Sequence, residues 1–246
     1  MDLFVKAFDW LTDPAQWSGN AGIPTRLVEH IEILGLAMLL AALVALPVGM
    51  YIGHTRRMEF LAVSSANVGR AIPSFGLLAI LFPLTLRYNV PGSIGFAATL
   101  IAMVLLAVPP LLTNAYVGVQ TVDRETVEAA RGMGLSGRQV LLHLELPLAA
   151  PLIVAGIRTA AVQVVATATL GALVGWGGLG RFITFGFAIG VRREGGPIIV
   201  GGAFLVAALA VLTELALAGL ERLVRPRTTS RGRRRSRVAR QPAPAA

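Results

Sequence analysis

The sequence predicts an all-α protein that crosses a membrane several times. Of its 246 residues, 55% are hydrophobic and only 14% are charged, and the mean hydropathy is +0.70. Soluble domains rarely combine such values. The sequence contains several apolar stretches of about 20 residues, which is the length that a helix needs to cross a hydrocarbon core. The chain has no cysteine, which excludes disulfides and thiolate metal sites.

Five spans are predicted, each an apolar run bounded by polar turns. They cover approximately residues 31–52, 60–82, 94–116, 150–174 and 197–220. Prolines inside spans are tolerated where neighbours satisfy the freed carbonyl groups. We therefore expect Pro73 and Pro83 to interrupt the regular backbone hydrogen bonds of the second helix. Pro109-Pro110 should kink or loosen the third.

The chain divides into three regions. Residues 1–25 carry no secretory signal, because Lys6, Asp9 and Asp13 interrupt the apolar run, and they are expected to lie at the membrane interface. Residues 26–222 form the membrane domain. Residues 223–246 are rich in arginine and are predicted to be a disordered tail that attracts anionic lipids, at about 1 kcal/mol per basic residue. Nucleic acid is not an expected partner, because the folded part shows no binding module.

A long polar interval, residues 121–147, separates two spans and is expected to project from the membrane and meet a partner. Two short helices joined by a glycine turn are predicted. The first has a narrow apolar face made by Val122, Thr126, Ala129 and Met133. Gly134 supplies the turn. Ser136 and Gln139 have the form of a capping box, so a second helix is expected to start there and run towards Pro147.

A spaced pattern in this interval resembles the EAA loop of permease subunits from bacterial ABC importers. It consists of Glu128-Ala129-Ala130, Gly134, Leu144 and Leu146-Pro147, with leucine at 144 where isoleucine is common. The resemblance implies a type I ABC importer permease with a core of about five transmembrane helices. It also implies that these residues form a coupling helix, which fits a groove on a separate ATPase subunit.

Two spans carry polar side chains along one helical face. The predicted translocation-path residues are Ser64, Asn67, Arg70 and Ser74 in the second span and Thr159, Gln163 and Thr167 in the fourth. Polar side chains in spans usually face the bundle interior or a water-filled path. Close packing of helices explains the pattern of the fourth span equally well.

Three charged residues lie inside spans at a similar depth: Arg70, Arg158 and Glu214. Isolated charges at that depth are costly. Glu214 is therefore predicted to pair with one of the two arginines near the inner gate.

Further motifs are similar to those of permeases for osmoprotectants, namely glycine betaine, carnitine, choline and related quaternary amines. They are Ile72-Pro73-Ser74, Gly156-Ile157-Arg158-Thr159-Ala160, Thr167-Ala168-Thr169-Leu170 and Gly175-Trp176-Gly177-Gly178-Leu179-Gly180. The similarity covers roughly residues 25–222. It implies a permease dimer, of identical or paralogous chains, with an external solute-binding protein and two ATPase subunits that hold ATP and Mg²⁺. Arg70 departs from the neutral polar residue usual in that family, and the tail is not part of its shared core.

No catalytic, cofactor or metal site is predicted on this chain. Lys6 is the only lysine, so a G-x-x-x-x-G-K phosphate loop is excluded and ATP hydrolysis must occur on another chain. The three histidines lack metal-site spacing. Nine arginines in 222–240 give the cytoplasmic side its excess of positive charge, which predicts an N-terminus outside and a C-terminus inside. The resemblance to ABC importer permeases implies the bacterial inner membrane.

Alternative functions remain open from the sequence. The same core could carry another small solute, such as an amino acid. An ATP-independent secondary transporter or channel is a different class, but no inverted repeat is present and residues 121–147 would lack a purpose. Residues 171–196, a glycine-rich loop with an interfacial helix, could be a gate or a static loop.

Overall fold

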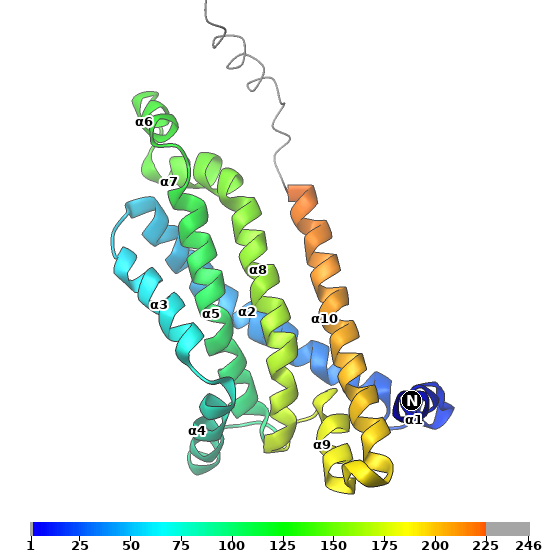
Figure 1. The fold of residues 1–246 in the computed structure, drawn as a ribbon. Helices are drawn as coiled ribbons and strands as arrows, with labels where there is room; N and C mark the ends of the chain where they lie inside the picture. Colours follow the sequence, from blue (N-terminus) through cyan, green and yellow to red (C-terminus); the bar gives the residue numbers. More distant parts are fainter. Residues whose placement is uncertain (1, 225–246) are drawn as a thin grey trace, which may run out of the picture.

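The computed structural model describes residues 2–224, apart from the side chains of Arg70, Arg192, Arg193 and Val224. Every regular element in that part is helical (Figure 1). The helices are α1 (Asp2–Thr12), α2 (Ile23–Thr55), α3 (Glu59–Ala71), α4 (Ser74–Arg87), α5 (Phe96–Gln120), α6 (Arg124–Gly132), α7 (Gly137–Val140), α8 (Leu146–Ala168), α9 (Gly180–Ile189) and α10 (Gly196–Val224). Short 3-10 or π turns cover Pro14–Trp17, Leu141–Glu145, Thr169–Val174 and Val191–Gly195. The predicted tail lies outside the described residues from position 225 onward.

Four helical segments are long and apolar enough to cross a membrane. They are α2, α5, the run Gly137–Val174 that contains α8, and α10. The bent pair α3–α4 makes a fifth if it counts as one span. The predicted class, an all-α membrane protein with about five spans, is therefore confirmed.

The second predicted span, residues 60–82, is not one continuous helix. α3 and α4 meet at an angle of 93°. Ile72 and Pro73 have extended backbone between them, because proline lacks an amide hydrogen and disfavours the helical conformation in the residue before it. Pro83, in contrast, lies inside α4 without ending it.

α5 lies at the centre of the bundle, where it packs against α2, α3, α4 and α8. Its contact with α2 is close because small side chains meet there, as is usual between membrane helices. Ala41 and Ala102 have no exposed surface. A Cβ on Gly49 would lie 2.6 Å from the carbonyl oxygen of Leu112, so this position accepts only glycine. α5 continues through Pro109-Pro110 to Gln120.

The two ends of the bundle carry different elements. α6 and α7 lie at the end to which the C-terminal end of α10 also points, whereas α4 and α9 lie at the opposite end (Figure 1). α1 packs on α10 near that second end, and its Trp10 ring stands edge-on to Phe182 with a centroid separation of 5.1 Å. Phe4 and Phe8 of α1 remain 72% and 66% exposed. This exposed aromatic face is typical of an interfacial helix.

Candidate functional site

α6 is a short helix held at its first turn by a side-chain cap. The Asp123 carboxylate accepts hydrogen bonds from the Thr126 backbone N–H at 3.2 Å and the Thr126 hydroxyl at 2.9 Å. These bonds hold the pKa of the Asp123 carboxyl below its ordinary value. Glu125 in the first turn and Arg131 in the last suit the helix dipole.

The Asp123 cap yields a prediction for local stability. Asp123→Ala should speed hydrogen exchange of the amides at the start of α6, because the cap bonds are lost. Since the folded-state pKa is lowered, the contribution of the carboxylate is present above its ordinary pKa and is lost as the pH falls through the folded-state value. Exchange measured by mass spectrometry at neutral pH tests this. Unchanged exchange in Asp123→Ala, with Glu125→Ala as the control, would contradict it.

The face by which α6 contacts the bundle differs from the predicted one. Of the four residues expected to form an apolar face, only Val122 is buried. Ala130 is buried instead, while Ala129 is exposed and Met133 is 76% exposed. The helix thus rests on Ala130 and turns Ala129 and Met133 outwards. The periodicity of the apolar residues did not predict this face, because a helix of only 9 residues has too few apolar positions to specify which side packs on the bundle.

The second helix of the interval begins where the capping box predicts. Ser136 and Gln139 exchange both capping bonds, and Gly134 has a φ of +90°, a conformation that favours glycine. The helix does not end at Pro147, however, since the helical run continues to Val174. A π turn at Leu141–Glu145 precedes Pro147 near the start of α8. Such a turn accommodates a proline that cannot donate a hydrogen bond.

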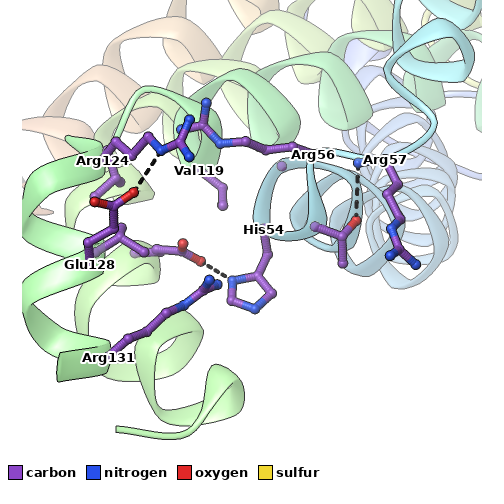
Figure 2. Close-up of a pocket in the computed structure, with 12 residues that line it drawn as sticks. His54, Arg56, Arg57, Val119, Arg124, Glu128 and Arg131 are labelled. Carbon is purple, nitrogen blue, oxygen red and sulfur yellow. Dashed lines mark hydrogen bonds and ion pairs between the residues drawn. The ribbon is translucent and has the colours of Figure 1, made fainter. Parts of the chain in front are cut away.

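A basic pocket of about 390 Å³ lies beneath α6. It is formed by the ends of α2 and α5, by α6, and by the π turn (Figure 2). The lining residues are Gly53, His54, Thr55, Arg56, Arg57, Val119, Val122, Arg124, Val127, Glu128, Arg131 and Glu145. Its two carboxylates are paired: Glu128 with Arg124 Nε at 2.9 Å, and Glu145 with His54 Nδ1 at 2.5 Å. The second pair ties α2 to the π turn across 91 residues of sequence.

A second cavity, of about 500 Å³, lies between α3, α4, α5 and α8. Four of the predicted path residues line it: Ser74, Thr159, Gln163 and Thr167. Ser64 and Asn67 are not among the lining residues, and the side chain of Arg70 lies outside the described part of the structure. The rest of the lining is Ala66, Gly69, Ile72, Leu106, Pro109, Pro110, Thr113 and Asn114.

Sequence analysis missed the contribution of α5 to this cavity. Thr113 and Asn114 follow the two prolines and are polar residues inside a predicted span, a signal that could have found them. The Asn114 amide donates to the Pro110 carbonyl at 2.8 Å. The Thr113 hydroxyl is buried and has no hydrogen-bond partner among the described residues. The described lining contains no charged or aromatic side chain.

Arg158 of α8 contacts two carboxylates of α10. Its Nε lies 3.2 Å from Glu214, the residue predicted to pair with Arg70 or Arg158, and its Nη1 lies 2.8 Å from Glu221. Glu221 is buried and was missed because it lies near the predicted end of the membrane domain. Glu214 and Glu221 are seven residues apart, which places them on one face of a helix.

At the opposite end, Glu29 and His30 of α2 hold the glycine-rich segment before α9. Glu29 accepts a hydrogen bond from the Gly178 backbone N–H at 2.7 Å and pairs with Arg26 at 2.9 Å. His30 Nδ1 accepts from the Leu179 N–H at 3.3 Å, so Nε2 carries the proton and donates to the Val165 carbonyl at 3.1 Å. One buried histidine thus joins α2, α8 and this segment.

Together these features define a class of protein. Apolar spans surround a polar cavity, and a capped surface helix stands at one end of the bundle, an arrangement that suits the membrane subunit of a transporter. Across residues 2–224, no group of three or more His, Asp or Glu side chains could hold a metal ion.

The chain belongs to the family of binding-protein-dependent transport system inner membrane components, whose sequence model matches residues 45–226. It is therefore an integral membrane subunit of a transporter, and it resides in the inner membrane.

Curated relatives cover most of the chain. The glycine betaine/carnitine/choline transport system permease protein OpuCB of Bacillus subtilis is 32% identical over 199 residues, which are 81% of this chain and 87% of the relative. The carnitine transport permease protein OpuCB of Listeria monocytogenes is 33% identical over 205 residues, 83% of this chain and 89% of the relative. Among solved structures, a chain of the inward-facing MetNI methionine ABC transporter aligns with a TM-score of 0.73 at 23% identity, covering 87% of this chain and all of that one. The fold is that of a type I ABC importer permease.

Proposed function

We propose that this chain is the permease subunit of an ATP-driven importer for osmoprotectants of the glycine betaine, carnitine and choline type. The observation that carries the proposal is the EAA-type motif on the capped helix α6, in a chain whose relatives are named for these solutes. ATP and Mg²⁺ are bound by a separate ATPase subunit, and an external solute-binding protein delivers the solute.

α6 is the proposed contact with the ATPase. Buried Ala130 anchors it to the bundle, while Ala129 and Met133 face outwards and Glu128 is exposed although it also lines the basic pocket beneath the helix. Leu144 and Leu146 are half-buried at the turn into α8, next to exposed Pro147. Because the helical run continues from Gly137 to Val174, a push on α6 and α7 is transmitted directly to a helix that lines the cavity.

The cavity between α3, α4, α5 and α8 is the proposed solute path. Ser74, Thr159, Gln163 and Thr167 line it together with Thr113 and Asn114, and Ser64, Asn67 and Arg70 belong to the helix leading to it. A cavity for tight binding of a quaternary ammonium ion would contain aromatic faces, and the described lining has none. The binding protein is therefore the proposed source of selectivity.

The remaining assignments concern assembly and orientation. Two permease copies, identical or paralogous, form the proposed dimer, with the N-terminus outside and the C-terminus inside. Residues 1–25 lie at the outer interface and residues 26–222 form the permease domain, whereas the lipid contact predicted for residues 223–246 falls outside the described residues from position 225 onward.

The test is uptake of labelled glycine betaine into proteoliposomes that contain this chain, its ATPase and its binding protein. Uptake should require ATP, and Glu128→Arg should lower it about tenfold or more, because a reversed charge at an interface costs several kcal/mol. Glu125→Arg, on the same helix but outside the motif, is the matched control and should transport normally. ATP-dependent uptake of a different solute would support the assignment as an ATP-driven importer but reject osmoprotectants as its solutes. Uptake without ATP would reject both.

A further inference from the structure

The basic pocket beneath α6 holds more positive charge than its carboxylates can neutralise. Four arginines line it, Arg56, Arg57, Arg124 and Arg131, against Glu128 and Glu145. Each carboxylate already has a partner inside the pocket. The pocket therefore retains a surplus of positive charge.

The guanidinium groups in the pocket are poorly supplied with acceptors. Figure 2 shows Arg56 and Arg124 reaching towards each other, and Arg131 extending alongside His54. Arg56 donates only to the Gln120 carbonyl, at 3.3 Å, and the Arg131 guanidinium has no acceptor among the described residues. Like charges that converge in this way are stabilised by an anion between them.

Two residues at the pocket rim have a left-handed backbone conformation that is unfavourable for residues with a side chain. Arg56 and Met58, in the turn between α2 and α3, have φ angles of 53° and 63°. The left-handed conformation costs roughly 1–2 kcal/mol for a residue with a side chain, and glycine or asparagine avoids most of that cost. An arginine at position 56 therefore points to a role for its side chain.

The depth of the pocket and its guanidinium groups both suit a phosphate ligand. α5 has 25 residues, which span about 37 Å at a rise of 1.5 Å per residue, compared with a hydrocarbon core of about 30 Å. A pocket at its end therefore lies at the level of the lipid headgroups. Planar guanidinium groups match the oxygens of a phosphate in paired hydrogen bonds.

We propose that this pocket binds a phosphate group through Arg56, Arg124 and Arg131, below the coupling helix. The source is either the headgroup of an anionic phospholipid or a soluble phosphate such as a nucleotide. A bound phosphate would join the end of α2, through Arg56, to α6 and so hold α6 in position. The inference concerns a site distinct from the solute cavity and does not depend on which solute is carried.

The test compares two double variants of the full chain, purified in neutral detergent without the ATPase. Arg56→Gln/Arg131→Gln removes two guanidinium groups from the pocket. Arg87→Gln/Arg138→Gln removes the same charge from exposed arginines outside it and is the control. Both retain the arginines of the tail. Native mass spectrometry measures bound phosphatidylglycerol against phosphatidylcholine, and thermal shift measures binding of inorganic phosphate and ATP.

The pocket variant should bind a phosphate ligand about tenfold more weakly than the wild type and the control. Loss confined to phosphatidylglycerol identifies the lipid as the source, and loss confined to inorganic phosphate or ATP identifies a soluble ligand. Equal binding by both variants would overturn the proposal. Equal thermal midpoints without ligand verify that both variants are folded.

Discussion

Arg158→Leu is expected to lower the free energy of unfolding by about 3–5 kcal/mol, the usual cost of removing one partner of a buried ion pair. The change leaves Glu214 and Glu221 without the guanidinium that contacts both of them, at 3.2 and 2.8 Å. The Glu221 side chain is only 9% exposed. Glu214 is more open, but it lies on a helix long and apolar enough to cross a membrane, and lipid does not solvate charge as water does.

The effect should appear as a lower thermal midpoint of the detergent-solubilised protein, by roughly 6–20 °C at 2–4 °C per kcal/mol for a chain of this size. α10 should also separate more readily from α8, which proteolysis would detect. Arg181→Leu, at the exposed opposite end, is the control for loss of a single positive charge. A thermal midpoint equal to that of the wild type would show that the three-residue contact does not hold α10.

A triple variant separates charge from packing. Arg158→Leu/Glu214→Leu/Glu221→Leu should regain most of the stability lost by Arg158→Leu, because well-packed apolar residues often replace a buried ionic group without loss. If the triple variant is as unstable as the single one, the shape of Arg158, and not its charge, is what α8 and α10 require.

His30→Leu is expected to have the second large effect, at about 2–5 kcal/mol of unfolding free energy. The side-chain volume is roughly kept, but the Leu179 N–H loses its acceptor and the Val165 carbonyl, which also belongs to the ladder of α8, loses one donor. A buried group left without its partner costs about 1–3 kcal/mol. His30 is 1% exposed, so water cannot replace the ring nitrogens.

Hydrogen exchange offers a local readout for His30→Leu. The amides of residues 177–180 should exchange faster, since of the side-chain hydrogen bonds that the structure describes to this segment, the one from Gly178 to Glu29 alone remains. His143→Leu provides a control, because His143 is exposed and bonds only within its own turn, to the Gln139 carbonyl at 3.1 Å. Unchanged exchange in His30→Leu would mean that the segment is held by packing alone. Lost transport with an intact ATPase contact would assign the segment to the outer gate.

Much of the fold follows from local physics that the sequence displays. Long apolar runs can form only helices in lipid, because the backbone must satisfy its own hydrogen bonds. Pro73 favours a break between α3 and α4 because it lacks an amide hydrogen and restricts Ile72, whereas Pro83 does not end its helix. The 93° angle at the break depends on how α3 and α4 pack on α5. The capping box at Ser136 and the polar interval around α6 are likewise local features.

The sequence by itself therefore determined the membrane class, the approximate spans, the two short helices within residues 121–147 and the family motif. Tertiary structure alone decided the partners of residues far apart in the chain. It brought His54 to Glu145, His30 to Leu179, and Arg158 to Glu221. It also turned Ala130, and not Met133, towards the bundle. The physical reason is that helix periodicity specifies which residues share a face, whereas the neighbour of that face is chosen by packing across the whole bundle.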